Sequence, residues 1–379
     1  MHPLPLSMLF LIAFAFISLQ VSALPNKTLV APIIKDSKTS LYTITLNSHE
    51  KYVIDINAPL SWRLCPNPPS PVSCSAPQCY QARSFLSGMC PPANNIWMKY
   101  GQCQCVVTPV NSVAKSCVPE RLTYGSFILN WTNGKNPTGV AKLNKIYYSC
   151  ASKTLFKSLP QGVSGLAALS RAPLSFSSQF SRDYLGMAKS LQFVSLVETG
   201  LPALLSLEMG ISINGKASKF SPNAFSFDSN GNGGVKLSTL VPYTVLRSDI
   251  YKTLLNDFSK ATKSIPRVKN VSPFGLCMKA SAMGWTRWGL MAPTIELELG
   301  NGVVWRIYGV NSMKEVGNDV ACLAFVDGGK TAKEAVVIGA YQMENQFLEF
   351  DLAGSRLGLS PSLYSYRTSC ANFNFTTAV

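Results

Sequence analysis

"VIDINAPLSWRLC" spans residues 53–65 and decides the fold, because it reads as a strand, a tight turn and a second strand. One carboxylate, Asp55, lies on the turn. The stretch "VKLSTLVPYTVL" (235–246) has the same shape: an apolar strand, a small polar turn and an apolar continuation. Two comparable β-rich halves, each built around such a unit, indicate an internal duplication with a cleft between the halves.

The remaining patterns predict an all-β chain with a few short helices. Alternating apolar and polar residues predict strands, among them 41–47, 51–56, 60–65, 121–131 and 141–150. The clearest helix spans 247–262, with Ser248 as its expected cap and an apolar face made of Ile250, Leu254, Leu255 and Phe258. The least regular region, 196–233, places the domain boundary near residue 200, between halves 24–200 and 201–379.

The N-terminus has the features of a secretory signal peptide. An apolar run, "MLFLIAFAFISL", is followed by the small residues "VSA" that end at Ala23, so residues 1–23 are predicted to be removed. No later stretch approaches the roughly 20 apolar residues that span a bilayer. We therefore expect a secreted, extracellular protein without a membrane segment in its mature form.

Cysteine usage agrees with secretion. All 11 cysteines follow the signal, and the seven between residues 65 and 117 indicate a loop-rich segment held by disulfides. Zinc is the alternative, but the spacing is not that of a zinc ribbon and histidine is nearly absent, so we expect no metal and no other cofactor. The odd number leaves one thiol unpaired or paired between chains.

The chain is strongly basic, with 34 Lys and Arg against 19 Asp and Glu, a net charge of +15. The basic residues form no run of five or more, so nucleic acid is not an expected partner. A basic secreted protein would instead meet acidic polysaccharide, such as that of a cell wall, or acidic proteins. Sequons predict glycosylation at Asn26, Asn130, Asn270 and Asn374, although the proline after the third sequon disfavours its use.

Several blocks match one known family. The chain resembles the pepsin-like aspartic proteases in its two turns, in "GVSGLAALSRAPLSFSSQFS" and in "VVIGAYQMENQFLEFDLAGSRLGLS". It is most similar to the plant branch of xylanase and endoglucanase inhibitors, extracellular dermal glycoproteins and basic seven-S globulins, through "PYTVLRSDIYK", "VSPFGLC", "GVNSM", "CLAFVDGG" and "RTSCANFNFTT". The resemblance implies a bilobal pepsin-like fold, with two β-barrel-like lobes around a central cleft.

An active member of that family needs two carboxylates that share a water, each on an Asp-Thr/Ser-Gly turn. Here the first turn reads Asp55-Ile56-Asn57, and the second reads Ser238-Thr239-Leu240. The second acid is missing and both glycines are replaced. One carboxylate cannot supply both the base and the acid, so the resemblance predicts a protein without protease activity.

Because the cleft lacks a complete pair of catalytic carboxylates, binding is the function that we expect. The inhibitor branch acts on microbial glycoside hydrolases, whose two catalytic carboxyl groups form a negative pocket. In endoglucanase-inhibiting members, arginines from two loops enter that pocket, and the matching loops here are "GWTRWGL" (284–290) and "LYSYRTSC" (363–370). The resemblance assigns that role to Arg287 and Arg367, with rim candidates Trp285, Trp288, Tyr364 and Tyr366.

The choice of target follows from the same C-terminal loop. Cereal xylanase inhibitors present a histidine there, but residues 360–370 contain none. The resemblance therefore favours a xyloglucan-specific endoglucanase over a xylanase as the target.

By their positions, Cys277 is predicted to pair with Cys322, and Cys150 with Cys370. The stretch 185–235 is shorter than in relatives, and the loss of a cysteine there would leave a thiol free.

Other functions remain open. A seed storage or ligand-binding globulin fits the charge, the disulfides and the sequons equally well. An atypical aspartic endopeptidase would have to work with Asp55. His49, the one histidine after the signal, reads as a turn or surface residue rather than part of a nucleophilic site. "VDGGK" (326–330) reads as a hairpin turn rather than a phosphate loop.

Overall fold

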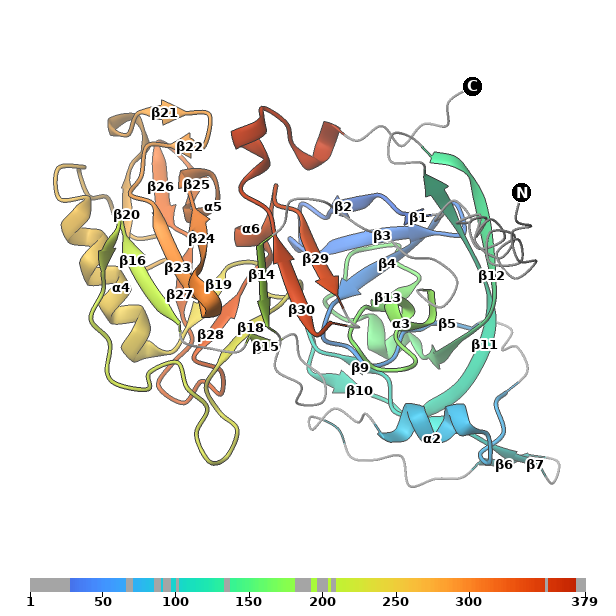
Figure 1. The fold of residues 1–379 in the computed structure, drawn as a ribbon. Coiled ribbons are helices and arrows are strands. Elements are labelled where there is room, and N and C mark those ends of the chain that lie inside the picture. Colours follow the sequence, from blue (N-terminus) through green and yellow to red (C-terminus); the bar gives the residue numbers. More distant parts are fainter. Residues whose placement is uncertain are drawn as a thin grey trace, which may run out of the picture.

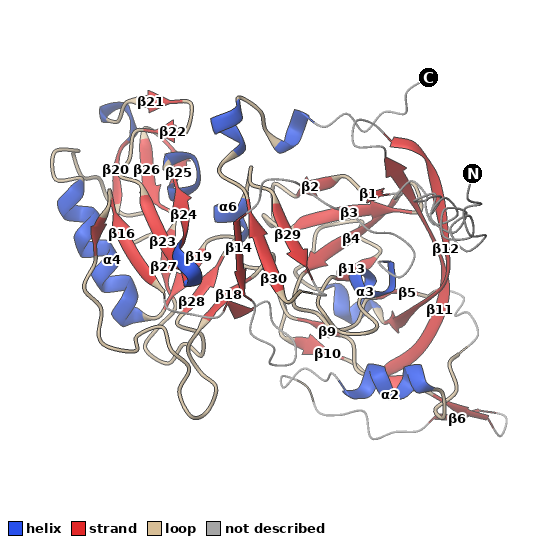
Figure 2. Ribbon diagram, viewed as in Figure 1, coloured by secondary structure: helices blue, strands red, loops and turns tan. Residues whose placement is uncertain are grey.

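The structure is a computed structural model that describes residues 28–65, 71–84, 90, 97–99, 102–132, 137–180, 192–195, 204–205, 209–351 and 354–372. The predicted signal peptide, residues 1–23, lies outside this part of the chain. Strands dominate and the helices are short (Figure 2), which confirms the predicted fold class. Figure 1 shows two groups of strands, one formed mainly by the first half of the chain and the other by the second half.

The first half consists mainly of one open sheet, in the order β1-β11-β12-β5-β13-β4-β3-β2, with β8 beside β11. Its ends are strand edges, so it is not a closed barrel. The elements are β1 (Thr28–Val30), β2 (Ile33–Lys35), β3 (Tyr42–Leu46), β4 (Glu50–Asp55), β5 (Trp62–Leu64), α2 (Pro77–Ser84), β6 (Trp97–Lys99), β7 (Gln102–Gln104), β8 (Val106–Val107), β9 (Val110–Asn111), β10 (Ser116–Cys117), β11 (Glu120–Thr132), β12 (Pro137–Ala151), η1 (Lys153–Phe156), β13 (Gly165–Ala168) and α3 (Phe176–Phe180).

The second half distributes its strands over several smaller sheets. Its elements are β15 (Leu204–Leu205), β16 (Gly210–Ile213), β17 (Lys216–Ala217), β18 (Val235–Leu237), β19 (Thr244–Leu246), α4 (Ser248–Ala261), β20 (Cys277–Lys279), η2 (Ala280–Ala282), β21 (Trp285–Thr286), β22 (Gly289–Leu290), β23 (Ile295–Leu299), η3 (Gly300–Gly302), β24 (Val303–Ile307), α5 (Gly309–Ser312), β25 (Met313–Gly317), β26 (Val320–Leu323), β27 (Phe325–Asp327), β28 (Val336–Ile338), α6 (Ala340–Met343), β29 (Leu348–Asp351), β30 (Arg356–Leu359), η4 (Leu363–Tyr366) and η5 (Cys370–Asn372).

The two halves repeat one strand arrangement around their turns. In the first half, β13 pairs parallel with β4 and antiparallel with β5. In the second half, β28 pairs parallel with β18 and antiparallel with β19. The outer neighbours also correspond, because β12 is parallel to β5 and β27 is parallel to β19. The duplication inferred from the sequence is therefore present in the topology.

A small sheet joins the two halves. Strand β14 (Gln192–Ser195) pairs antiparallel with β30, which pairs in turn with β29. Figure 1 shows these three strands between the two groups. One continuous cluster of buried side chains also includes residues of both halves, such as Tyr52 and Phe127 in the first and Phe258 and Trp305 in the second. The predicted boundary near residue 200 lies outside the described residues.

Helix α4 forms where the sequence predicts it, but it begins differently. Ile250, Leu254 and Phe258 are buried, as the apolar face requires. The expected cap, Ser248, is instead the first helical residue, and its hydroxyl donates to Asp327 at 2.6 Å. The prediction of a serine cap is wrong, because the hydroxyl of Ser248 donates its hydrogen bond to the carboxylate of Asp327 on β27 and does not cap the helix.

The disulfides correct one predicted pair. Cys277 pairs with Cys322, as expected, from directly opposed positions on β20 and β26. Cys150, however, pairs with Cys65 and leaves Cys370 as an exposed free thiol. The parallel register of β5 and β12 places Cys150 opposite Arg63, two residues from Cys65, and a sequence does not reveal that register. The remaining pairs are Cys74–Cys103, Cys79–Cys105 and Cys90–Cys117.

The described residues provide neither a membrane-spanning helix nor a metal-binding cluster. No described helix is long and apolar enough to cross a membrane. No group of three or more His, Cys, Asp or Glu side chains within the described ranges could hold a metal ion.

Candidate functional site

The two central turns have the same local geometry but different chemistry. Asp55 ends β4, and its Oδ1 accepts a hydrogen bond from the backbone N–H of Asn57 at 2.8 Å. Ser238 follows β18, and its Oγ accepts from the backbone N–H of Leu240 at 3.3 Å. Each turn therefore places an oxygen at the same position. In the first turn that oxygen belongs to a carboxylate, and in the second it belongs to a hydroxyl.

The turns also bind each other. Thr239 Oγ1 donates to the carbonyl of Ile54 at 2.7 Å and accepts from the N–H of Ile56 at 3.4 Å. In the opposite direction, Asn57 Nδ2 donates to the carbonyl of Leu237 at 2.9 Å. These bonds join the central strands of the two halves in both directions, although the residues of the turns depart from the protease pattern.

Asp55 has an environment that disfavours its charge. Its side chain is buried, with 2% exposed, and this burial raises the pKa of the carboxyl above its usual range. The backbone N–H of Asn57, the charge of Lys236 and the N–H of Ala58 oppose that rise without cancelling it. Among residues 55–57 and 238–240, Asp55 is the one side chain that titrates at ordinary pH.

Asp55→Asn is expected to gain stability relative to the wild type as the pH rises from 4 to 7. Because the folded pKa is raised, the native carboxyl holds its proton to higher pH than the unfolded one does. The wild type therefore loses stability as the pH rises through the folded pKa, by about 1.4 kcal/mol for each pH unit that separates the two pKa values, and the amide does not. Urea unfolding of both proteins at pH 4, 5.5 and 7 measures the difference. A difference that is constant with pH contradicts the raised pKa.

Arg287 lies at the tip of a hairpin formed by β21 and β22. The arginine is exposed, and its guanidinium carbon lies 4.2 Å from the centroid of the Trp288 ring. Trp288 in turn stacks on Tyr308, with centroids 5.4 Å apart and an interplanar angle of 22°. Gly289 permits the turn, because it has φ +86° and a Cβ there would lie 2.6 Å from the nitrogen of Val310. The guanidinium of Arg287 therefore packs against a ring that is itself stacked on a second ring.

Arg367 follows η4 and adopts a left-handed conformation with φ +56°. Its backbone N–H donates to the carbonyl of Tyr364 at 3.1 Å, so the chain turns sharply and the exposed side chain leaves the helical turn. Trp288 Nε1 donates to Ser365 Oγ at 3.3 Å. This bond brings the two predicted arginine loops together, although 77 positions separate the bonded residues.

The aromatic rim predicted around the arginines divides into two kinds of residue. Trp285 and Tyr366 are largely exposed, at 66% and 64%, and are available for contact. Trp288 and Tyr364 are half-buried and support the loops instead. Met291, which the sequence pattern did not single out, is 59% exposed next to the hairpin. Its position directly after the stretch "GWTRWGL" (284–290) is the sequence signal that would have found it.

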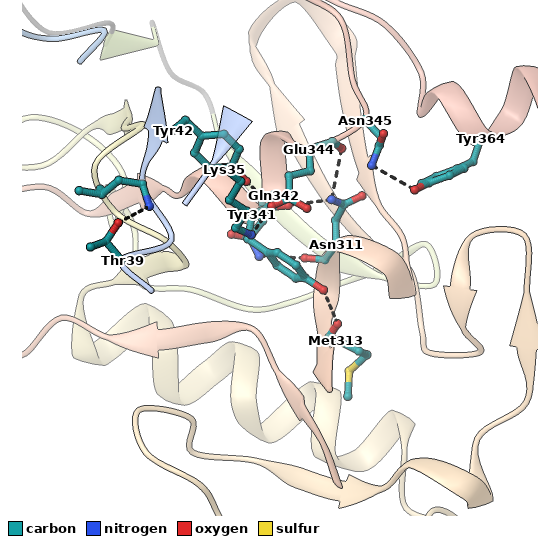
Figure 3. A network of polar contacts seen from close by, with 11 residues as sticks. Lys35, Thr39, Tyr42, Asn311, Met313, Tyr341, Gln342, Glu344, Asn345 and Tyr364 are labelled. Carbon is teal, nitrogen blue, oxygen red and sulfur yellow. Dashed lines mark hydrogen bonds and ion pairs between the residues drawn. The ribbon is translucent and has the colours of Figure 1, made fainter. Parts of the chain in front are cut away.

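The C-terminal loop is held from below by a polar network (Figure 3). Asn345 Nδ2 donates to the hydroxyl of Tyr364 at 3.1 Å. Asn345 Oδ1 accepts from the backbone N–H of Cys370 at 3.2 Å. One amide thus fixes both ends of the loop that carries Arg367.

The same network reaches into the first half of the chain. Glu344, next to Asn345, forms an ion pair with Lys35 at 2.6 Å and accepts a hydrogen bond from the hydroxyl of Tyr42. The Lys35 ammonium also lies 5.5 Å from the ring centroids of Tyr42 and Tyr341. Strands β2 and β3 therefore support the segment that precedes the C-terminal loop.

Two predicted glycosylation sites lie in the described part of the chain. Asn130 is half-buried on β11, where it pairs with both β1 and β12. Asn270 uses both ends of its amide, because Nδ2 donates to the carbonyl of Gly275 at 2.8 Å and Oδ1 accepts from the N–H of Cys277 at 3.0 Å. Asn26 and Asn374 lie outside the described residues. All four sites stay predictions.

Comparison with known proteins matches both halves. The family model described as "Xylanase inhibitor N-terminal" matches residues 39–192, and "Xylanase inhibitor C-terminal" matches residues 207–361. The chain is 32% identical to probable aspartic proteinase GIP2 of Nicotiana benthamiana, over 93% of this chain and 92% of that protein. It is 30% identical to gamma conglutin 1 of Prunus dulcis, over 93% and 91%. The crystal structure of EDGP superposes with a TM-score of 0.83 at 30% identity, over 93% of this chain and 99% of that chain.

The repeated strand–turn–strand units and the contact between their turns define a pepsin-like protein made of two β-rich halves. This chain belongs to the xylanase inhibitor family of that fold. The resemblance inferred from the sequence is confirmed, and the family implies binding to glycoside hydrolases.

Proposed function

We propose that the protein is a secreted, non-hydrolytic inhibitor of microbial glycoside hydrolases, with a xyloglucan-specific endoglucanase favoured over a xylanase. The observation that carries the proposal is the bond between Trp288 and Ser365, which places the exposed Arg287 and Arg367 loops side by side. Family membership supports the class of target, and the two arginines support the mode of binding.

Loss of hydrolysis follows from the turns. Peptide cleavage by this fold needs one ionised and one protonated carboxyl group around a shared water. Ser238 supplies neither, because its hydroxyl stays neutral and accepts a hydrogen bond within its own turn. Asp55 alone, buried and bonded to its turn, cannot fill both roles. The junction of the two turns therefore contributes structure rather than chemistry.

Arginine suits the proposed target for physical reasons. A glycoside hydrolase cuts with two carboxyl groups that flank the scissile bond, usually about 5–10 Å apart. A guanidinium is always charged and forms two parallel hydrogen bonds with a carboxylate. Stacking on Trp288 limits the freedom of Arg287 before binding, which reduces the entropy cost of ordering it. The net charge of +15 favours encounter with an acidic enzyme or with acidic cell-wall polysaccharide in the apoplast.

The preference for an endoglucanase comes from the C-terminal loop. Residues 360–370 contain Arg367 and no histidine, whereas the family resemblance assigns a histidine there to xylanase binding. A histidine would also make binding depend on pH near 6.5, and arginine does not. Inhibition of the proposed target is therefore expected to be nearly constant between pH 5 and 7, apart from the titration of the enzyme itself.

An inhibition assay tests the proposal. The purified protein is titrated into a fungal xyloglucan-specific endoglucanase and, separately, into a xylanase of the same culture filtrate. We expect stoichiometric inhibition of the first and weaker inhibition of the second. Incubation with a denatured protein substrate at pH 3–5, with and without pepstatin, should show no cleavage. Inhibition of neither hydrolase, or cleavage that pepstatin blocks, would refute the proposal.

A storage or ligand-binding globulin is the second candidate, supported by the resemblance to basic seven-S globulins and by the 27% identity to basic 7S globulin 2 of Glycine max over 93% of this chain. The two functions predict different locations. An inhibitor should be present in the walls of leaf or root and increase upon infection, whereas a storage globulin should accumulate in seeds. Transcript and protein levels in those tissues distinguish them.

A further inference from the structure

Asn345 lies between α6 and β29 and forms three hydrogen bonds with the segment that carries Arg367. Its backbone carbonyl accepts from the N–H of Leu363 at 2.9 Å. Its side-chain amide donates to the hydroxyl of Tyr364 at 3.1 Å (Figure 3) and accepts from the N–H of Cys370 at 3.2 Å. One residue thus holds the segment at its start and at its end, on either side of the arginine.

The backbone of Arg367 has a conformation that needs such support. Its φ of +56° lies in the left-handed region, which is unfavourable for a residue other than glycine and persists where the surrounding structure holds it. The arginine side chain is exposed, so burial does not fix its place. The turn is held by backbone bonds instead, from the N–H of Arg367 to Tyr364 at 3.1 Å and from the N–H of Thr368 to Leu363 at 3.2 Å. Both acceptor residues are bound by Asn345.

Asn345 is itself held by elements outside the loop. Its own φ of +54° is left-handed, a conformation that asparagine adopts more readily than most residues. Asn311 of α5 is buried, and its Nδ2 donates to the carbonyls of Tyr341 and Glu344 at 2.7 and 3.3 Å. The carboxylate of Glu344 is paired with Lys35 of β2 (Figure 3). The position of Asn345 is therefore fixed by α5 and β2 and does not depend on the loop.

We propose that Asn345 is a positioning residue of the inhibitor surface and sets the turn at Arg367 before the target binds. This inference rests on the proposed function. A group that is already ordered in the free protein loses less entropy on binding. If the turn forms only part of the time, the apparent affinity falls in proportion to the fraction of molecules in which it is formed. Asn345 acts through the backbone of Arg367 rather than by contact with the target.

Hydrogen exchange of the free protein tests whether Asn345 orders the loop. Asn345→Gly removes the amide and keeps a residue that accepts the left-handed backbone. The exchange rate of the Cys370 N–H should rise about tenfold or more, because its acceptor is gone. The matched control is Asn47→Gly, because Asn47 also has a left-handed backbone, with φ +50°, and a half-buried amide that is used at both ends. Its Oδ1 accepts from the N–H of Ile128 at 2.7 Å and its Nδ2 donates to Glu50 at 2.8 Å, so the control should leave the Cys370 N–H unchanged.

Binding kinetics with the endoglucanase test the positioning role. Asn345→Gly should slow association about tenfold and change dissociation less than about twofold, because the target meets fewer molecules in which the turn is formed. Arg367→Ala should instead speed dissociation, because it removes a contact with the target. Tyr364→Phe removes one of the two side-chain bonds and should slow association about threefold. Asn345→Asp should restore the wild-type rate to within about threefold, because its carboxylate can accept from both the Cys370 N–H and the Tyr364 hydroxyl.

The two measurements separate this inference from the proposed function. An unchanged exchange rate of the Cys370 N–H in Asn345→Gly overturns the inference. Faster exchange with an unchanged association rate also overturns it, and inhibition then stands without a positioning role for Asn345. If the wild type does not inhibit, the proposed function falls together with any role toward the target, whereas the exchange rates still decide whether Asn345 orders the turn at Arg367.

Discussion

Replacing Arg287 and Arg367 together by alanine is expected to weaken binding to the endoglucanase by at least about 100-fold. Arginines at the centre of an interface often contribute 2 kcal/mol or more each, and every 1.4 kcal/mol is a factor of ten. Both side chains are exposed in the free protein, so their removal should leave its stability nearly unchanged. Alanine keeps a Cβ at Arg367, so the strain of the left-handed backbone is the same in both proteins.

The inhibition constant of the variant against the endoglucanase measures the effect. The control removes two positive charges elsewhere: Lys51→Ala plus Lys142→Ala, both exposed strand residues of the first half. That control should change affinity by less than about threefold at 0.15 M salt, because it alters long-range attraction only. Arg287→Lys plus Arg367→Lys should restore part of the binding. If the alanine variant inhibits as well as the control, the arginines do not enter the target.

Removal of the Cys65–Cys150 disulfide is expected to destabilise the protein by about 4 kcal/mol. The two cysteines are 85 positions apart, and a cross-link over a loop of that length strongly restricts the unfolded chain. The same bond connects the end of β5 to the end of β12 in the sheet that carries Asp55. Urea unfolding of Cys65→Ala plus Cys150→Ala gives the loss of free energy.

Cys370→Ser is the matched control. Cys370 is exposed and unpaired, so its change should cost less than about 0.5 kcal/mol. A thiol reagent should label the native wild type once, and the Cys370→Ser variant not at all. If Cys370→Ser destabilises as much as the double variant, or if its labelling is unchanged, then Cys150 does not pair with Cys65.

The sequence reveals the parts of this fold that depend on local pattern. The alternation in 121–131 and 141–150 predicts the strands found at Glu120–Thr132 and Pro137–Ala151. The helical period of 247–262 predicts α4. The two turns can be aligned with each other because each has an apolar strand on either side. In each case, the residues that determine the structure are neighbours in the chain.

Contacts between segments that are distant in the chain could not be predicted from the sequence. The bond from Trp288 to Ser365 depends on how the second half folds, and the sequence shows only two loops that each contain an arginine. The pairing of Cys150 depends on the register between β5 and β12. The support of the C-terminal loop by Asn345 gives no sequence signal, because an asparagine shortly before a strand is common in any β-rich chain.

The pairing of β14 with β30 affects how the protein is made. Residues 192–195 leave the ribosome long before residues 356–359, so the edge of β14 cannot be covered during most of synthesis. We therefore expect that the edge of β14 stays unpaired in the secretory pathway until β30 has been synthesised. Chaperones are expected to bind the first half during that time. A chain that is clipped or terminated before Arg356 would keep this edge permanently and would tend to aggregate rather than leave the cell.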